Sequence, residues 1–211
     1  MSSKIKLVSN LADIASALYA VRNFKNLIET FNFIIEGIVG VEYNELYLID
    51  PSNNKLSLFF AKGYTDQEKI EAESTAMERY PGLVIANKEI LNIADTKIDK
   101  LNKCDDSNRK FKIRSQVWLP IMNKNKSVGV LGLASKLPNK FNNEHIDTLK
   151  FVCDIAGVVH DNIVLTIEKE RKEEDLNIAL TKSKRDQAVK QKFFVKMSHE
   201  IRTPMNAIIG L

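Results

Sequence analysis

The last third of the chain contains no proline between Pro138 and Pro204, and Gly157 is the only glycine between them. Because proline and glycine are the residues that most often end a helix, this stretch predicts one helix that runs from His145 almost to the C-terminal end. At its start, Phe141 and Ile146 have the spacing of a hydrophobic staple around the candidate N-cap Asn142. The sequence therefore predicts a packed domain and a long helix that leaves it.

Apolar residues on the first part of this helix fall on two stripes. One has the alternating three- and four-residue spacing of a coiled-coil seam and comprises Leu149, Val152, Ala156, Val159 and Ile163. The other, expected to face a sheet, comprises Phe151, Ile155, Val158 and Leu165. We therefore expect the first stripe to pair with a second copy in a homodimer; the alternative is one wide stripe that packs on the core of a single chain.

The middle of the helix is strongly charged. Residues 168–175 are eight consecutive charged residues, which provide a solvated helix surface and no seam. The spacing of four and three then resumes at positions 176, 180, 183, 187, 190, 194, 197, 201, 204, 208 and 211, with polar residues at 183, 187 and 190. We interpret residues 166–192 as a coiled-coil linker, which either transmits a signal through a weak seam or serves as a plain flexible spacer.

The first forty residues have helical periodicity, which predicts two helices or one bent helix, with Asn23 as a candidate N-cap for the second. Residues 41–62 then predict a β-hairpin around a turn at 50–54. In its second strand, Leu56, Leu58 and Phe60 alternate with Lys55, Ser57 and Phe59, which is the two-residue period of a strand.

The next segment begins with Thr65 and Glu68, which have the spacing of a capping box. They predict a helix that Pro81-Gly82 should end. A strand at 90–93 follows, and the apolar runs 117–122 and 128–134 predict a second hairpin whose strands are covered on both faces.

This order of helices and strands implies an α+β fold, an antiparallel sheet with helices on its faces. The order, together with Ser115-Gln-Val-Trp-Leu-Pro-Ile-Met and Ser127-Val-Gly-Val-Leu-Gly-Leu-Ala-Ser135, resembles a GAF domain over residues 23–165, preceded by an N-terminal helix in residues 1–22. The resemblance implies a pocket against the sheet. Ligands of this pocket across the family include cyclic nucleotides, bilins, haem and small metabolites, and nothing in this sequence chooses among them.

Individual residues point to no cofactor or metal. Cys104 lacks the following histidine of the bilin-attaching GAF domains, and we expect it and Cys153 to be free thiols. His145 and His160 are candidate haem ligands that we interpret as surface or interface residues.

The charge and hydropathy of the chain argue against a nucleic-acid-binding protein and against a membrane-spanning one. The net charge is +4, and the lysine-rich segment 97–126 is interpreted as a solvated surface rather than a nucleic-acid interface. No apolar stretch approaches the length of a membrane span. We expect a cytoplasmic protein.

The C-terminal segment carries the most specific motif. It reads Phe193-Phe-Val-Lys-Met-Ser-His-Glu-Ile-Arg-Thr-Pro-Met-Asn-Ala-Ile-Ile-Gly-Leu211. It resembles the H-box of the dimerisation and phosphotransfer domain of sensor histidine kinases, so residues 193–211 are interpreted as the start of the phosphoacceptor helix. The heptad count places His199 midway between Met197 and Ile201, at the outermost position, where its largely neutral imidazole is a competent nucleophile.

The resemblance implies a role for each of three residues. His199 would be the phosphoacceptor, Glu200 the acid/base partner, and Thr203, on the same helix face, the residue that positions water when a partner is dephosphorylated. Pro204 is expected to bend the helix just beyond them. The same resemblance implies transfer of the phosphoryl group to a response-regulator aspartate.

The family resemblance also implies an ATP-binding catalytic domain, which these 211 residues do not contain, so we expect no autophosphorylation by this fragment alone. The leading hypothesis is the sensory and phosphoacceptor portion of a sensor histidine kinase that is regulated by its GAF domain. The alternatives are a non-catalytic dimeric signalling adaptor and a small-ligand-binding GAF module.

Overall fold

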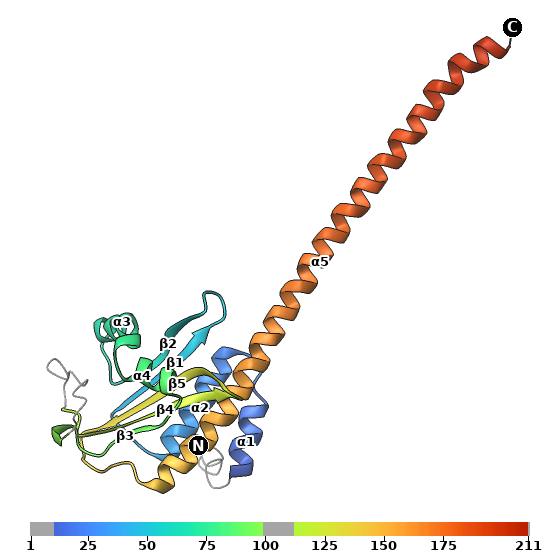
Figure 1. Ribbon diagram of the computed structural model, residues 1–211. Helices are drawn as coiled ribbons and strands as arrows, with labels where there is room; N and C mark the ends of the chain where they lie inside the picture. The colour runs from blue at the N-terminus through green and yellow to red at the C-terminus, as the bar shows by residue number, and fades with distance from the viewer. Residues whose placement is uncertain (1–10, 99–111, 211) are drawn as a thin grey trace. The chain divides into compact units, whose positions relative to one another are not determined.

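The computed structural model describes residues 11–98 and 112–210, apart from the side chains of residues 199, 203, 204 and 206–209 (Figure 1). The chain divides into two units, the first ending at Val164 and the second beginning at Leu165. The described elements are α1 (Leu11–Tyr19), α2 (Phe24–Ile38), β1 (Tyr43–Asp50), β2 (Lys55–Lys62), α3 (Asp66–Ser74), α4 (Tyr80–Asn87), β3 (Leu91–Ile93), β4 (Ser115–Asn123), β5 (Lys126–Ser135) and α5 (Asn143–Ile209). Short 3-10 turns occupy Ala76–Glu78 and Thr96–Ile98.

The five strands form one sheet in the order β2-β1-β5-β4-β3, and every neighbouring pair is antiparallel. Both predicted hairpins are confirmed, and β1, β5 and β4 lie inside the sheet. The expected antiparallel sheet with flanking helices, followed by a long C-terminal helix, is therefore the observed fold.

Local side-chain chemistry starts three of the helices where the sequence predicts. The Asn23 side chain accepts a hydrogen bond from the amide of Asn26 at the start of α2. Thr65 and Glu68 form a complete capping box on α3. At the start of α5, the amide of His145 donates to the side chain of Asn142 at 2.8 Å.

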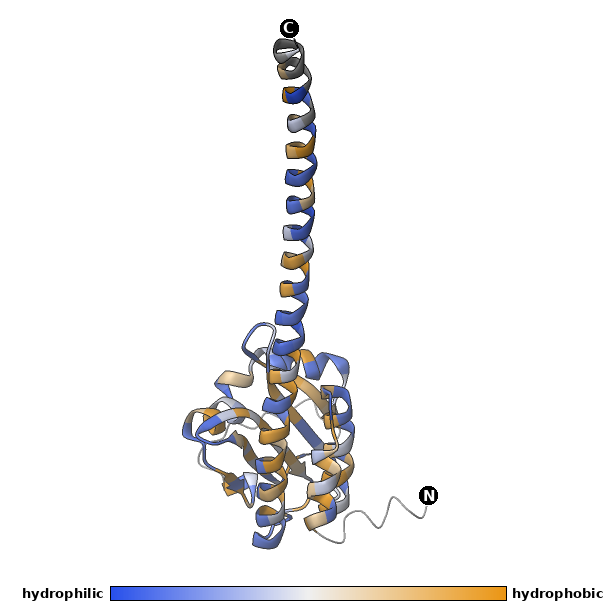
Figure 2. Cartoon of the chain, turned by 90° about the vertical axis from the view of Figure 1, so that its right-hand side faces the viewer, coloured by the Kyte–Doolittle hydropathy of each residue, from blue (hydrophilic) through white to orange (hydrophobic). Residues whose placement is uncertain are grey.

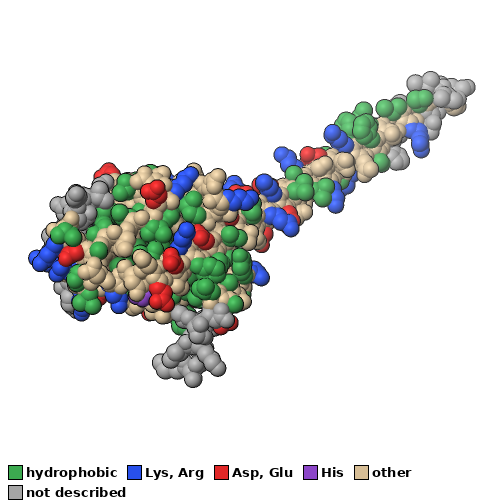
Figure 3. All heavy atoms as spheres, turned by 60° about the horizontal axis from the view of Figure 1, so that its bottom comes forward, with side chains coloured by type: hydrophobic (Ala, Val, Ile, Leu, Met, Phe, Trp, Pro, Cys, Tyr) green, Lys and Arg blue, Asp and Glu red, His purple; other side chains and the backbone are tan. Residues whose placement is uncertain are grey.

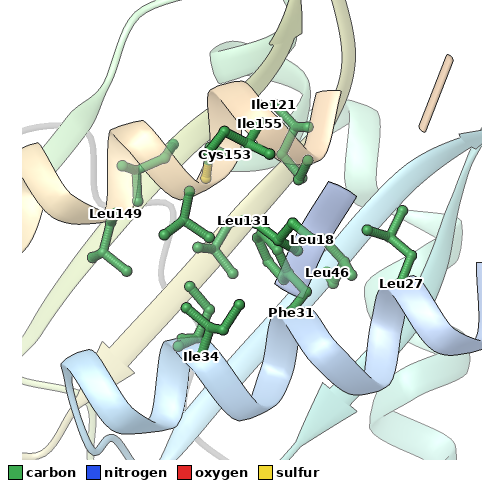
Figure 4. Packing of buried hydrophobic residues seen from close by; sticks show 14 of the residues in the cluster. Leu18, Leu27, Phe31, Ile34, Leu46, Ile121, Leu131, Leu149, Cys153 and Ile155 are labelled. Carbon is green, nitrogen blue, oxygen red and sulfur yellow. The ribbon is translucent and has the colours of Figure 1, made fainter. Parts of the chain in front are cut away.

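The two faces of the sheet carry separate apolar clusters. Helices α1, α2 and the first part of α5 cover one face, where the larger cluster includes Leu18, Phe31, Leu131, Leu149 and Cys153 (Figure 4). The second face lies under α4 and the turn before it, with Tyr80 and Val84 packed among strand residues.

The expected division of α5 into a dimer stripe and a sheet-facing stripe is wrong. Every residue of the stripe assigned to the dimer is at most 3% exposed and lies in the core of one chain: Leu149, Val152, Ala156, Val159 and Ile163. In the stripe expected to face the sheet, Ile155 is buried but Val158 is 37% exposed. The alternative of one wide core-facing stripe is the correct one, because a helix that crosses a sheet buries more than a narrow seam.

Two further expectations fail for local reasons. Pro81-Gly82 does not end α3, which ends at Ser74; Pro81 lies in the first turn of α4, where a missing amide hydrogen costs nothing. In β2, a register shift opposite Leu46 and Tyr47 breaks the expected alternation. Phe60 therefore packs in the larger cluster while Leu56 and Leu58 pack in the smaller one.

Beyond Val164, α5 is a single helix along which hydrophilic and hydrophobic residues are interspersed (Figure 2). Its surface mixes charged and apolar side chains (Figure 3). Apolar residues on this part are strongly exposed, for example Leu176 at 69% and Phe194 at 66%. In the described part of the chain, none of the helices has an apolar window long enough to span a bilayer.

Candidate functional site

The predicted phosphoacceptor segment lies on the C-terminal part of α5, which stays helical through position 204 to Ile209. His199, Glu200 and Thr203 are therefore all on one continuous helix. Residues three and four apart on a helix are neighbours on its surface, so Thr203 lies one turn after both His199 and Glu200. The side chains of His199 and Thr203 lie outside the described set, and their roles stay predictions.

Glu200 is an exposed residue of this helix. Its carboxylate is 3.7 Å from the ammonium group of Lys196, an i,i+4 pair whose two side chains are 61% and 77% exposed. Such an exposed pair contributes little to stability. The carboxylate therefore remains accessible to solvent.

Apolar side chains flank the motif without cover from the rest of the chain. Met197 is 38% exposed and Ile201 52% exposed. Both belong to the heptad positions predicted as a seam, and both are exposed in a single chain. Pro204 has no amide hydrogen to donate to the carbonyl of Glu200, although the helix continues past it; a bend there stays a prediction.

A second polar site, which the sequence analysis missed, lies on the sheet face under α4. Glu45 is 5% exposed, and its carboxylate accepts hydrogen bonds from the hydroxyl groups of Tyr47, at 2.7 Å, and Tyr64. Burial, and then the negative charge of Glu45, raise the pKa of Tyr47 well above its ordinary value. The available signal was the placement of Glu45 between Tyr43 and Tyr47, which alternation puts on one face of β1.

The same face carries a buried amide with an unused donor. Gln116 accepts a hydrogen bond from the indole of Trp118 at 3.1 Å, while its own Nε2 has no hydrogen-bond partner among the described residues. A side chain at Gly132 would meet the Trp118 ring at 2.3 Å, so the ring lies directly over this glycine. Tyr80 packs against Trp118 with 5.9 Å between ring centroids. The chain's own aromatic rings thus occupy the space over the middle of the sheet.

Among the histidines and cysteines, the burial of His160 differs from the surface position expected from the sequence. His160 is not a surface residue: it lies on α5, is 3% exposed, and contacts the end of β1 and Phe24 of α2. His145 is partly exposed, with a buried Nδ1 that has no hydrogen-bond partner in the described structure. Cys104 lies outside the described residues.

Cys153 is a fully buried free thiol, and burial raises its pKa. Within residues 11–98 and 112–210, no group of three or more His, Cys, Asp or Glu side chains is arranged to hold a metal ion.

Comparison with known proteins agrees with this architecture. A family model described as "GAF domain" matches residues 25–160. A curated relative, the autoinducer 2 sensor kinase/phosphatase LuxQ of Vibrio harveyi, is 32% identical over 82 residues, which is 38% of this chain and 9% of the relative. The match thus spans only a small part of that protein's length.

Solved structures of similar fold have TM-scores slightly above 0.5. The GAF domain of an Acinetobacter phosphoenolpyruvate-protein phosphotransferase has a TM-score of 0.54 at 21% identity, covering 71% of this chain and 89% of that one. A free methionine-R-sulfoxide reductase from Neisseria meningitidis has 0.58 at 17%, covering 77% and 91%. A domain of a putative two-component sensor histidine kinase from Sinorhizobium meliloti 1021 has 0.51 at 12%, covering 74% and 99%. At these identities the likeness shows the fold alone.

Proposed function

This chain belongs to the GAF domain family through residues 25–160, and we propose that it is the sensory and phosphoacceptor portion of a cytoplasmic two-component sensor histidine kinase. His199 accepts a phosphoryl group from ATP and passes it to an aspartate of a response regulator, under control of the GAF domain. The observation that carries the proposal is the Ser198-His199-Glu200 motif, with its flanking Ile-Arg-Thr-Pro-Met, on the same helix that packs in the GAF core.

The chemistry needs a nucleophile, a proton acceptor and a phosphoryl donor. A ring nitrogen of His199 attacks the γ-phosphorus of ATP, a phosphorus–nitrogen bond forms, and the bond to the β,γ-bridging oxygen breaks to release ADP. The carboxylate of Glu200 accepts the proton from the other ring nitrogen and so increases the nucleophilicity of the attacking nitrogen. ATP itself would be bound by a catalytic domain outside these 211 residues.

The exposed apolar residues of α5 support a homodimer in this role. The core of one chain buries the helix only as far as Ile163, whereas Leu176, Leu180, Phe194, Met197 and Ile201 are all at least 38% exposed. A second copy of the same helix would cover these heptad positions. The proposed dimer seam therefore begins after the charged run, and not at Leu149.

The similarity to LuxQ supports the phosphatase role of Thr203. That relative is described as both a sensor kinase and a phosphatase. In this role Thr203, which is four residues after His199 in the sequence, would orient a water molecule for hydrolysis of the response regulator's phosphoaspartate. Thr203→Ala should then lower dephosphorylation of the regulator while leaving phosphorylation of His199 intact.

A labelling experiment tests the assignment of His199. The 211-residue chain is incubated with radiolabelled ATP and the catalytic domain of a histidine kinase supplied in trans, and acid-labile, base-stable phosphate is measured. The wild-type chain and the His145→Gln control should be labelled, and His199→Gln should fall to background. Glu200→Gln should slow labelling by about a hundredfold, within the range that general acid/base groups contribute.

Two results would refute the proposal. Labelling of His199→Gln at the wild-type rate would move the phosphoacceptor elsewhere. Absence of acid-labile phosphate on the wild-type chain, with a catalytic domain that labels its own phosphoacceptor domain in the same tube, would favour a non-catalytic adaptor.

A further inference from the structure

A groove lies beside β4, between the segment that precedes β3 and the first turns of α5. Its volume is about 320 Å³, which is within the size range of small-molecule sites. The apolar residues that line it are Ile90, Leu119, Pro120 and Met122. The groove therefore offers an apolar surface large enough for a small organic ligand.

The short length of β3 leaves this space open. β3 pairs with β4 only over Gln116–Trp118, whereas β5 pairs with β4 as far as Asn123. The last part of β4 thus has a neighbouring strand on one side only. Farther along α5, the backbone of Met122 lies directly against Gly157, so helix and strand leave no such space there.

Charged side chains of both signs form the rim of the groove. Lys150 and Asp154 are one turn apart on α5, and Lys88 and Glu89 belong to the segment before β3. The ammonium group of Lys88 donates to the carbonyl oxygen of Asn125 at 2.7 Å. None of the ion pairs in the described part of the chain includes Glu89, Lys150 or Asp154. Lys150 and Asp154 therefore bring one positive and one negative charge to the groove, neither of them paired.

The spacing of these two charges restricts what can meet both. Residues four apart on a helix have β-carbons about 5–6 Å apart, so a molecule with an ammonium and a carboxylate group close together can contact both side chains. The surroundings of Asp154 also remove water from its carboxylate. Burial raises the pKa of this carboxyl group, and the charge of Lys150 offsets part of that rise. A cationic group of a ligand would replace the lost hydration.

We infer that the groove binds a small zwitterion with an apolar tail, the simplest being a free α-amino acid with an aliphatic side chain. The carboxylate of the ligand pairs with Lys150, its ammonium group pairs with Asp154, and its side chain covers the apolar floor. With two cations and two anions on the rim, the groove favours a ligand without net charge. The inference goes beyond the proposed function by naming a chemical input, and it does not depend on phosphoryl transfer at His199.

A strand of another protein is the other occupant that an open sheet edge can accept. Pro120 lies in the open part of β4 and has no amide hydrogen to donate. Proline on an edge strand opposes pairing with a further strand. The backbone of a strand also carries no charge to match Lys150 and Asp154, so the groove suits a free amino acid better.

NMR titration of the full chain with L-leucine tests the site. The methyl signal of Met122, one of five methionines, should shift to saturation, whereas that of Met77, which is 62% exposed and outside the groove, should stay. We expect a dissociation constant of about millimolar, because a small ligand in an open groove makes few contacts.

Three analogues of leucine each remove one feature. Isocaproate lacks the ammonium group, isoamylamine lacks the carboxylate, and glycine lacks the apolar side chain. Each should bind about tenfold more weakly than leucine or worse, since the loss of a hydrogen bond to a charged group, or of the apolar contact, is worth at least about that factor.

Two variants separate the charges. Lys150→Gln should weaken leucine binding by about tenfold and leave isoamylamine unchanged, whereas Asp154→Asn should weaken leucine by about tenfold and leave isocaproate unchanged. Both residues are exposed, so both variants should keep the urea midpoint of the wild type. Asp147→Asn, a matched change at an exposed residue of α5 outside the groove, should bind leucine as the wild type does.

Absence of a saturable shift of the Met122 signal with leucine would overturn the inference. Equal binding of N-acetylleucinamide, in which both charges are blocked, would overturn it as well and would assign the groove to a peptide strand. Leucine binding that is unchanged in both variants would place the ligand elsewhere, with the same consequence. None of these measurements involves phosphoryl transfer, so failure of the groove site would leave the assignment of His199 untouched, and failed labelling of His199 would leave the groove site untouched.

Discussion

At Gly157, α5 passes close to the backbone at the end of β4, and Gly157→Ala tests how tightly the helix is held there. A β-carbon built at this position would lie 2.0 Å from the carbonyl oxygen of Met122 and 2.5 Å from its carbonyl carbon. These are backbone atoms at the end of β4 and cannot rotate away. The helix would have to withdraw by roughly 1.4 Å before the contact reached the 3.4 Å of ordinary packing.

Two effects of opposite sign decide the outcome. Alanine is the better helix former and would stabilise an isolated helix by about 1 kcal/mol over glycine. Overpacking typically costs about 1–3 kcal/mol, and the upper end applies because the obstacle is backbone. The net expectation is a loss of about 2 kcal/mol, which for a domain of this size lowers the melting temperature by about 4–8 °C.

The measurement is urea unfolding followed by the fluorescence of Trp118. Gly40→Ala is the matched control, because a β-carbon at Gly40 meets nothing within 4 Å. The control should be close to the wild type in stability. A Gly157→Ala chain as stable as the wild type or more so would show that helix propensity dominates and that α5 does not approach the sheet as closely as the structure places it.

Two further predictions concern the core. Leu149→Ala should destabilise the unit that ends at Val164 by about 2–5 kcal/mol in urea unfolding, because Leu149 is fully buried. Val158→Ala, at a 37% exposed position, should change its stability by less than about 0.5 kcal/mol. A larger loss of stability in Val158→Ala than in Leu149→Ala would restore the first stripe as a dimer seam. The second prediction uses a Cys104→Ser variant, in which Cys153 is the remaining thiol. Cys153 should react with a thiol reagent at least about a thousandfold more slowly in the native chain than in urea, because the reaction requires opening of the core. Rapid labelling of the native chain would contradict the burial of Cys153.

Features set by neighbouring residues were predictable from the sequence. The N-caps of α2 and α5 and the capping box of α3 depend on side chains within three residues of the amides they bind. The Ser198-His199-Glu200 motif is equally local, and its resemblance to an H-box is carried by the sequence alone, so the roles of its residues stay predictions. Pro81 was misread because the same residue suits the end of one helix and the start of another.

Features set by distant partners were not predictable. The imidazole of His160 meets a carbonyl group 111 residues earlier in the chain, and Tyr64 reaches Glu45 across 19 residues. The spacing of apolar residues identified two stripes on α5 but could not say which of them the sheet would bury. A seam and a core-facing stripe have the same periodicity, and only the sheet that lies against Leu149 and Val152 distinguishes them.

The corrected position of the stripe restricts how a signal could pass along α5. A change of helix register that included Leu149 and Val152 would expose several fully buried side chains, each at a cost of about 1.5–3 kcal/mol. From Leu176 onward the apolar side chains are already exposed in a single chain, and the polar residues at 183, 187 and 190 weaken the seam that a second copy could form. A change of register is therefore inexpensive only beyond the charged run. In the proposed histidine kinase, a stimulus in the GAF domain would have to reach that region through the last buried turns of the helix.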